Sequence, residues 1–210
     1  MEQARRLDRT RLLRYRPYAK QREFHANGAG HRERLLMAGN QLGKTFCGAA
    51  EAAIHLTGLY PDWWTGWRSA RPIRMWAGSK TSEVTRDTCQ RYLVGEPADE
   101  ATWGTGMIPA DRLLGWDRKS SSAPNALDNV TVKHTSGGTS KVGFKAYDQG
   151  REKWQGETLD AIWMDEEPPL ELYMEAITRT NAALGPLWIT FTPLLGFSAV
   201  VRMFLEENPL

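Results

Sequence analysis

The chain has 210 residues, of which 41% are hydrophobic and 25% are charged, and its formal net charge at pH 7 is +2. This size fits one globular domain with a core of its own, and no run of about 18 apolar residues is present, which excludes a membrane-spanning helix. The first residues carry charges without an apolar stretch, and the two cysteines form no disulfide or metal pattern. We therefore expect a reducing, cytoplasmic setting.

The positive charge is concentrated near the N-terminus. Residues 1–35 contain ten Arg or Lys and four Asp or Glu, a net charge of +6, which leaves −4 on the rest of the chain. A basic arm on a mildly acidic body fits an anionic partner such as DNA. It fits a solvated amphipathic arm equally well, because runs of charge are common on exposed faces. We divide the chain into a basic arm over residues 1–33 and a folded core over residues 34–210.

Strand-like and helix-like segments alternate along the chain, which predicts an α/β fold around a mainly parallel sheet. Residues 95–128 are irregular and rich in Gly, Pro and Ser, and we assign no element there. The expected elements, in chain order, are helices over 3–14 and 19–26, a strand over 34–38, a helix over 45–56, a strand over 73–77, a helix over 82–93 capped by Thr81 or Ser82, a hairpin of 130–134 and 141–147, a strand over 161–164, a helix over 170–183, a strand over 187–191 and a helix over 197–206.

A phosphate-binding loop is predicted between the strand over 34–38 and the helix that follows. In that pattern, backbone N–H groups surround a polyphosphate, a lysine neutralises the β- and γ-phosphates, and a hydroxyl reaches Mg²⁺. A turn with a surface lysine is the alternative, and the flanking strand and helix argue against it. The first position departs from the usual Gly. The loop consists of Ala38, Gly39, Asn40, Gln41, Leu42, Gly43, Lys44 and Thr45.

A second motif lies where the strand over 161–164 ends in three acidic residues. Beside a phosphate-binding loop, Asp165 would hold Mg²⁺ through water, and Glu166 would orient and polarise the attacking water. The alternative is an ordinary acidic start of the next helix, which the helix dipole would favour. The presence of both motifs in one chain favours the catalytic interpretation.

Together with three further segments, these motifs resemble the N-terminal ATPase domain of the large terminase subunit, the DNA-packaging motor of tailed bacteriophages. The segments are Tyr15–Phe24, Gly150–Gly156 and Thr190–Pro193, and the resemblance covers residues 15 to about 200. It implies a P-loop NTPase fold of the RecA/ASCE type, in which helices cover both faces of the sheet.

The resemblance also implies roles for single residues. Gln21 would pair with the adenine edge, and Tyr18 or Pro17 would pack on the ring. Thr190 and Thr192 would sense the γ-phosphate and couple hydrolysis to movement.

The implied activity is hydrolysis of ATP with Mg²⁺, which drives double-stranded DNA into procapsids in the host cytoplasm. The implied partners are a ring of like subunits, expected to be five, on the procapsid portal, and a small terminase subunit; no membrane is involved. A helicase-like translocase and a non-hydrolysing nucleotide-binding assembly module stay open as alternatives. The family's large subunit continues into a nuclease domain, whereas this sequence ends at Leu210, so we expect no nuclease activity from it.

Many terminases carry an arginine inside the phosphate-binding loop, where this sequence has Asn40 and Gln41. Arg151 is our candidate for an arginine finger that acts on a neighbouring subunit's nucleotide. A surface salt bridge is the alternative.

The remaining aromatic and histidine residues suggest no site. Trp63, Trp64 and Trp67 could stack on DNA, but we expect them to pack their loop onto the core. Phe24, Trp76 and Trp188 are expected in the core, and the four histidines lack metal spacing.

Overall fold

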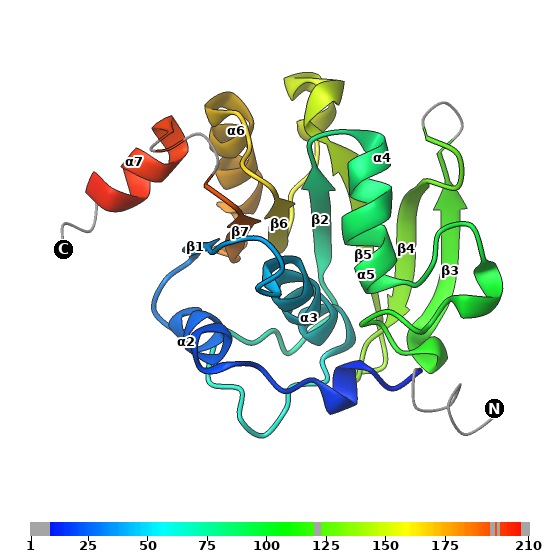
Figure 1. The fold of residues 1–210 in the computed structure, drawn as a ribbon. Helices are drawn as coiled ribbons and strands as arrows, with labels where there is room; N and C mark the ends of the chain where they lie inside the picture. The colour runs from blue at the N-terminus through cyan, green and yellow to red at the C-terminus, as the bar shows by residue number, and fades with distance from the viewer. Residues whose placement is uncertain (1–8, 120–122, 194–195, 197, 207–210) are drawn as a thin grey trace.

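The computed structural model describes residues 9–119, 123–193, 196 and 198–206. Its centre is a seven-stranded mixed sheet (Figure 1). The strands are β1 (Glu33–Met37), β2 (Arg74–Ser79), β3 (Leu113–Arg118), β4 (Leu127–Lys133), β5 (Thr139–Ala146), β6 (Ala161–Asp165) and β7 (Leu187–Phe191). Their order across the sheet is β1-β7-β6-β2-β5-β4-β3. The first five are parallel, β4 pairs antiparallel with β5, and β3 pairs antiparallel with β4. The predicted α/β class is confirmed.

The helices follow the expected segments closely, with one exception. They are α2 (Ala19–Asn27), α3 (Lys44–Thr57), α4 (Ser82–Thr85), α5 (Arg91–Leu93), α6 (Leu170–Thr180) and α7 (Ala199–Glu206), with a π-helical turn η2 (Arg86–Gln90) joining α4 to α5. Thr81 caps α4, because its hydroxyl accepts from the Val84 N–H at 3.2 Å.

The exception is the helix expected over 3–14, whose first residues lie outside the described ones. Within the described part, only the 3₁₀ helix η1 (Leu12–Arg14) forms. Leu12 and Tyr15 are both buried, and three residues per turn bring them to the same side.

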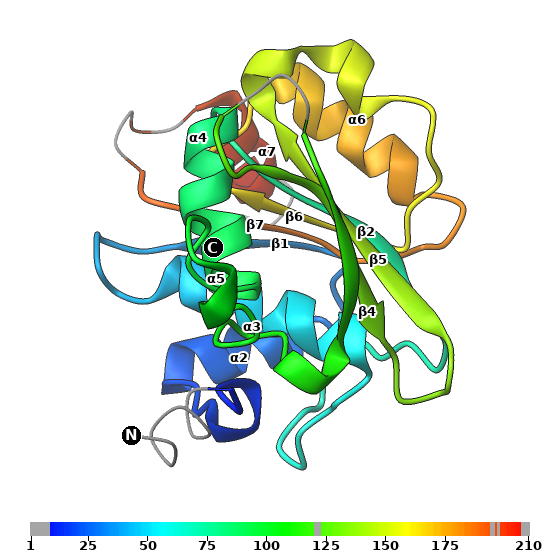
Figure 2. The ribbon, with the colours of Figure 1, turned by 90° about the vertical axis from the view of Figure 1, so that its right-hand side faces the viewer.

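Two hydrophobic cores lie on opposite faces of the sheet. Figure 2 shows α3 on one of these faces and α6 on the other. The alternation of side chains along β6 divides it between them. Ala161 and Trp163 face α3, whereas Ile162 and Met164 face the side of α6 and α7. This is the three-layer arrangement that the resemblance implied.

The parallel strands β1, β7, β6 and β2 end at one edge of the sheet, and this edge positions the candidate site. The register pairs Asp165 at the end of β6 with Thr190 on β7, and Leu36 of β1 with the same Thr190. The loop after β1 and the ends of β6 and β7 therefore meet, as ligand sites of open α/β sheets do.

Candidate functional site

The loop between β1 and α3 has the bends of a phosphate-binding loop. Gln41 and Gly43 both have positive φ, +60° and +76°. The backbone conformation of Gly43 favours glycine, and a Cβ there would also lie 3.0 Å from Nε2 of Gln21, which would have to shift slightly. Lys44 is 8% exposed, and its Nζ donates to the Gly39 carbonyl at 2.6 Å. The loop thus holds the lysine ammonium against its own backbone.

Two hydroxyls converge on one carboxylate oxygen at the end of β6. Thr45 and Thr190 donate to Oδ1 of Asp165 at 3.0 and 2.7 Å. The indole N–H of Trp163 donates to the Thr190 hydroxyl oxygen at 2.8 Å. Because an indole N–H can only donate, it fixes the direction of the Thr190 proton toward Asp165.

Asp165 is 1% exposed, and this burial controls its charge. Burial raises the pKa of Asp165 to about 6, although the hydrogen bonds from Thr190 and Thr45 oppose the rise. A nearby cation would favour the ionised form and lower this pKa again.

Glu166 follows with a left-handed backbone, φ +66°, which costs a non-glycine residue about 1–3 kcal/mol. Its N–H donates to the Thr190 carbonyl at 2.8 Å, and the Tyr147 hydroxyl lies 2.9 Å from its carbonyl oxygen. The Glu166 side chain lines a cavity of about 520 Å³ together with Lys80 and Thr192. The contacts of its N–H with Thr190 and of its carbonyl with Tyr147 thus hold Glu166 in the strained conformation at the wall of this cavity.

The loop and the end of β7 are also joined directly. The Thr192 hydroxyl donates to Oδ1 of Asn40 at 2.9 Å. The structure therefore brings Thr45, Asp165 and Thr190 together, and it binds Thr192 to the loop that carries Lys44.

A second cavity, of about 540 Å³, lies between α2 and β1 and reaches the loop at Leu42 and Lys44. Tyr18, which is 72% exposed, and Gln21 line it. The Gln21 amide is already engaged, since it accepts from the Tyr18 N–H at 2.9 Å and donates to the Gly43 carbonyl at 3.0 Å. Gln21 thus joins α2 to the phosphate-binding loop, and its pairing with adenine stays a prediction.

Comparison with known proteins shows the family of this chain. Residues 35–209 match the family model described as terminase large subunit, T4likevirus-type, N-terminal. The chain belongs to this family.

Two curated relatives in the family are terminase large subunits. The one from Salmonella phage P22 is 44% identical, over 94% of this chain and 43% of the relative. The one from Enterobacteria phage LP7 is 26% identical, over 94% of this chain and 44% of the relative. The chain therefore spans less than half the length of the curated relatives it matches.

Solved structures show the same fold. The large terminase from a thermophilic bacteriophage matches with a TM-score of 0.56 at 14% identity, covering 95% of this chain and 43% of that one. The same protein in complex with ADP matches with a TM-score of 0.55, again at 14% identity and over 95% of this chain and 42% of that one. At this identity the likeness concerns the fold alone.

Arg151 lies outside the cavity beside Glu166. It belongs to the 3₁₀ helix η6 (Arg151–Trp154), and its Nε donates to Glu175 of α6 at 2.8 Å. The hydrogen bond from Arg151 lowers the pKa of Glu175, against the effect of burial. The Arg151 side chain is nevertheless 60% exposed, so it is accessible to a neighbouring molecule. Its role as a finger stays a prediction.

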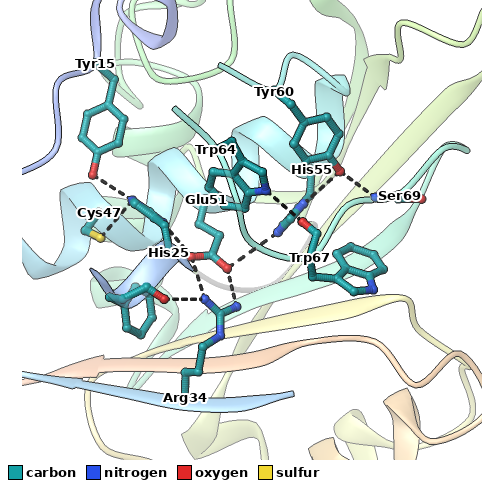
Figure 3. A network of polar contacts seen from close by, with 11 residues as sticks. Tyr15, His25, Arg34, Cys47, Glu51, His55, Tyr60, Trp64, Trp67 and Ser69 are labelled. Carbon is teal, nitrogen blue, oxygen red and sulfur yellow. Dashed lines mark hydrogen bonds and ion pairs between the residues drawn. The ribbon is translucent and has the colours of Figure 1, made fainter. Parts of the chain in front are cut away.

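The sequence analysis missed a buried ionic network behind the loop (Figure 3). Glu51 of α3 is fully buried, and both of its oxygens pair with the Arg34 guanidinium. His25 Nδ1 lies 2.8 Å from Glu51 Oε2, and His55 Nε2 lies 3.6 Å from Oε1. The sequence did contain one signal, a single carboxylate within the Ala-rich helix. A carboxylate buried with such a helix needs charged partners.

The network joins α2, β1 and α3, and the pKa values of Glu51 and His55 within it are both lowered. Burial alone would raise the pKa of Glu51, but Arg34 and the two histidines outweigh it and hold this pKa well below its usual range. Burial lowers the pKa of His55, so the ring is neutral in the folded chain near pH 7.

The tryptophans of the loop after α3 pack around this network, as expected. Trp64 is buried, and its indole N–H donates to the Trp67 carbonyl at 3.0 Å. The His55 ring lies within 5.3 Å of both indoles, centroid to centroid. Phe24, Trp76 and Trp188 are buried, as expected.

Within the described residues, no three His, Cys, Asp or Glu side chains lie close enough to hold a metal ion together. No helix of this part of the chain is both long and apolar enough to cross a membrane. A metal at this site would therefore depend on Thr45, Asp165, substrate phosphates and water, which is the usual environment of Mg²⁺.

Proposed function

We propose that this chain is an ATP-hydrolysing motor domain of a viral terminase large subunit, which moves double-stranded DNA into procapsids. The convergence of the Thr45 and Thr190 hydroxyls on Asp165, beside Lys44, is the observation that carries the proposal. A mere phosphate-binding turn needs no buried carboxylate with two hydroxyl donors. We assign the ATPase core to residues 34–210, and the basic arm with the adenine segment to residues 1–33.

Each side chain of the site has a separate role in this proposal. Lys44 would exchange the Gly39 carbonyl for phosphate oxygens. The Thr45 hydroxyl donates its proton to Asp165, so its oxygen lone pairs would be available to hold Mg²⁺. Mg²⁺, when bound, supplies charge that neutralises phosphate oxygens. Glu166, at the cavity wall, would orient a water for attack on the γ-phosphate.

Different observations support nucleotide binding, DNA binding and the binding of further partners. The structural relative from the thermophilic bacteriophage was solved in complex with ADP and with ATP-γ-S. We propose the portal of the procapsid, the small terminase subunit and assembly into a ring for this chain because it belongs to the family. DNA binding through contacts with the DNA phosphates would weaken steeply as the salt concentration rises.

Phosphate release by the 210-residue chain with ATP and Mg²⁺ tests the proposal. We expect Lys44→Ala to lose nucleotide binding, and Glu166→Gln to bind ATP but lose turnover. Glu152→Gln, an exposed acid on η6, is the matched control and should retain activity. Unchanged turnover in both site variants would reject the assignment. Strand displacement would favour a helicase-like translocase, and ATP binding without any turnover would favour an assembly module.

A further inference from the structure

Lys80 lies at the same edge of the sheet as Glu166. It directly follows β2, whose Gly78 pairs with Met164 of the neighbouring parallel strand β6. Two residues further along both strands, the Lys80 ammonium lies 3.9 Å from Oε2 of Glu166. Both side chains line the cavity of about 520 Å³ that also reaches Thr192.

The backbone of Lys80 is fixed, whereas its side chain is free to move. Its carbonyl accepts from the Asp148 N–H at 3.1 Å, which ties it to the segment after β5. The side chain is 55% exposed. A long flexible side chain on a fixed backbone can exchange one anionic partner for another without moving the strand.

Acidic residues outnumber basic ones among the described residues that line the cavity. Its described lining includes Asp148, Glu166 and Glu167, and Lys80 is the one Lys or Arg among the lining residues that the structure describes. The phosphate-binding loop contributes only Lys44, and Arg151 pairs with Glu175 outside the cavity. Transfer of a phosphoryl group depends on neutralising the charge of its oxygens.

We propose that Lys80 binds the γ-phosphate of ATP, and that it moves from Glu166 to the phosphate oxygens when the nucleotide enters. This inference rests on the proposed function. The γ-phosphate carries more charge than one carboxylate, so it competes well for the ammonium. The exchange leaves Glu166 free to hold the attacking water.

The test compares two nucleotides that differ at the γ-position. Dissociation constants of ADP and ATP-γ-S, with Mg²⁺, are measured for the wild-type chain, Lys80→Met, Lys80→Arg and the control Lys133→Met, an exposed lysine of β4. We expect Lys80→Met to weaken ATP-γ-S binding by about tenfold or more, because a charge-assisted hydrogen bond is lost. Its ADP affinity should stay within about twofold of wild type. Lys80→Arg should retain most of the ATP-γ-S affinity.

The turnover of ATP gives a second readout. We expect Lys80→Met to reduce kcat, with a melting temperature equal to that of wild type. Equal ATP-γ-S affinities for wild type and Lys80→Met would overturn the inference and leave the proposed function intact. Faster turnover in Lys80→Met would also overturn it, because Lys80 would then only restrain Glu166. Failure of the wild-type chain to bind either nucleotide would overturn both.

Discussion

Asp165 combines a structural cost with the chemistry expected of it. Its pKa in the folded chain, about 6, lies above its ordinary value of 3.8, so the folded state binds a proton more readily than the unfolded state. The favourable contribution is therefore complete below pH 3.8 and is lost as the pH rises through 6. At neutral pH the chain keeps a buried carboxylate that destabilises it.

We therefore predict that Asp165→Asn stabilises the chain at pH 8 by about 1–3 kcal/mol while abolishing Mg²⁺-dependent turnover. Urea unfolding at pH 8 and pH 5.5 measures the effect, and the gain should shrink at the lower pH. Asp117→Asn, an exposed carboxylate on β3, is the control. A loss of stability at pH 8 would contradict the prediction.

The single residues of the site were predictable to different degrees. Lys44, Thr45 and Asp165 follow from fixed spacing and from strands that end at one edge. The hydrogen bond from Trp163 was not predictable. A tryptophan in an apolar strand is typical of a hydrophobic core, and only the structure shows that its N–H donates to Thr190. Lys80 gave no signal either, since only the pairing of β2 with β6 places it beside Glu166.

At the scale of elements, the helix after the loop carries a pH-sensitive contact. The pKa of His55 is lowered from 6.5 by burial, so the unfolded chain binds a proton there that the folded chain does not. That contribution is present above pH 6.5 and is lost as the pH falls below it. The depressed pKa of Glu51 acts in the same direction at lower pH, below 4.5.

We predict that protonation of His55 lowers the free energy of unfolding between pH 7.5 and pH 5.5, against the opposite effect of Asp165 in the same range, and that His55→Gln removes this decrease. Urea unfolding at several pH values measures it. His31→Gln, an exposed histidine, should leave the dependence unchanged. An equally steep decrease in His55→Gln and wild type would show that other groups cause it.

The strands and helices were predictable where one face is buried, and β3 was not. In β3 the exposed large side chains Leu114 and Trp116 alternate with other partly exposed residues. An edge strand of this kind lacks the buried apolar pattern that marks a core strand. It forms because β4 offers unpaired backbone groups, and that is a tertiary effect.

At the scale of the whole molecule, the exposed guanidinium of Arg151 supports a test of subunit cooperation. We predict that a mixture of Arg151→Ala and Glu166→Gln chains, at concentrations at which chains associate, hydrolyses ATP faster than the sum of the two alone. An Arg151→Ala site retains its own Glu166 and would receive the arginine of a Glu166→Gln neighbour. Phosphate release at several total concentrations measures the gain.

The matched control mixes Lys44→Ala with Glu166→Gln, because both variants impair their own site and neither supplies what the other lacks. No gain is expected there. A mixture of Arg151→Ala and Glu166→Gln that is no more active than its parts would leave Arg151 with its partner Glu175 only.

The hydrogen bond between Thr192 and Asn40 has a mechanical consequence. A change in the shape of the loop would act directly on Thr192, which follows the last residue of β7 and precedes Pro193. The ring of Pro193 locks φ, so the backbone there cannot absorb the pull by rotating about that bond. Movement of the loop would therefore reach the chain that follows β7 through a joint with one backbone rotation fewer than usual.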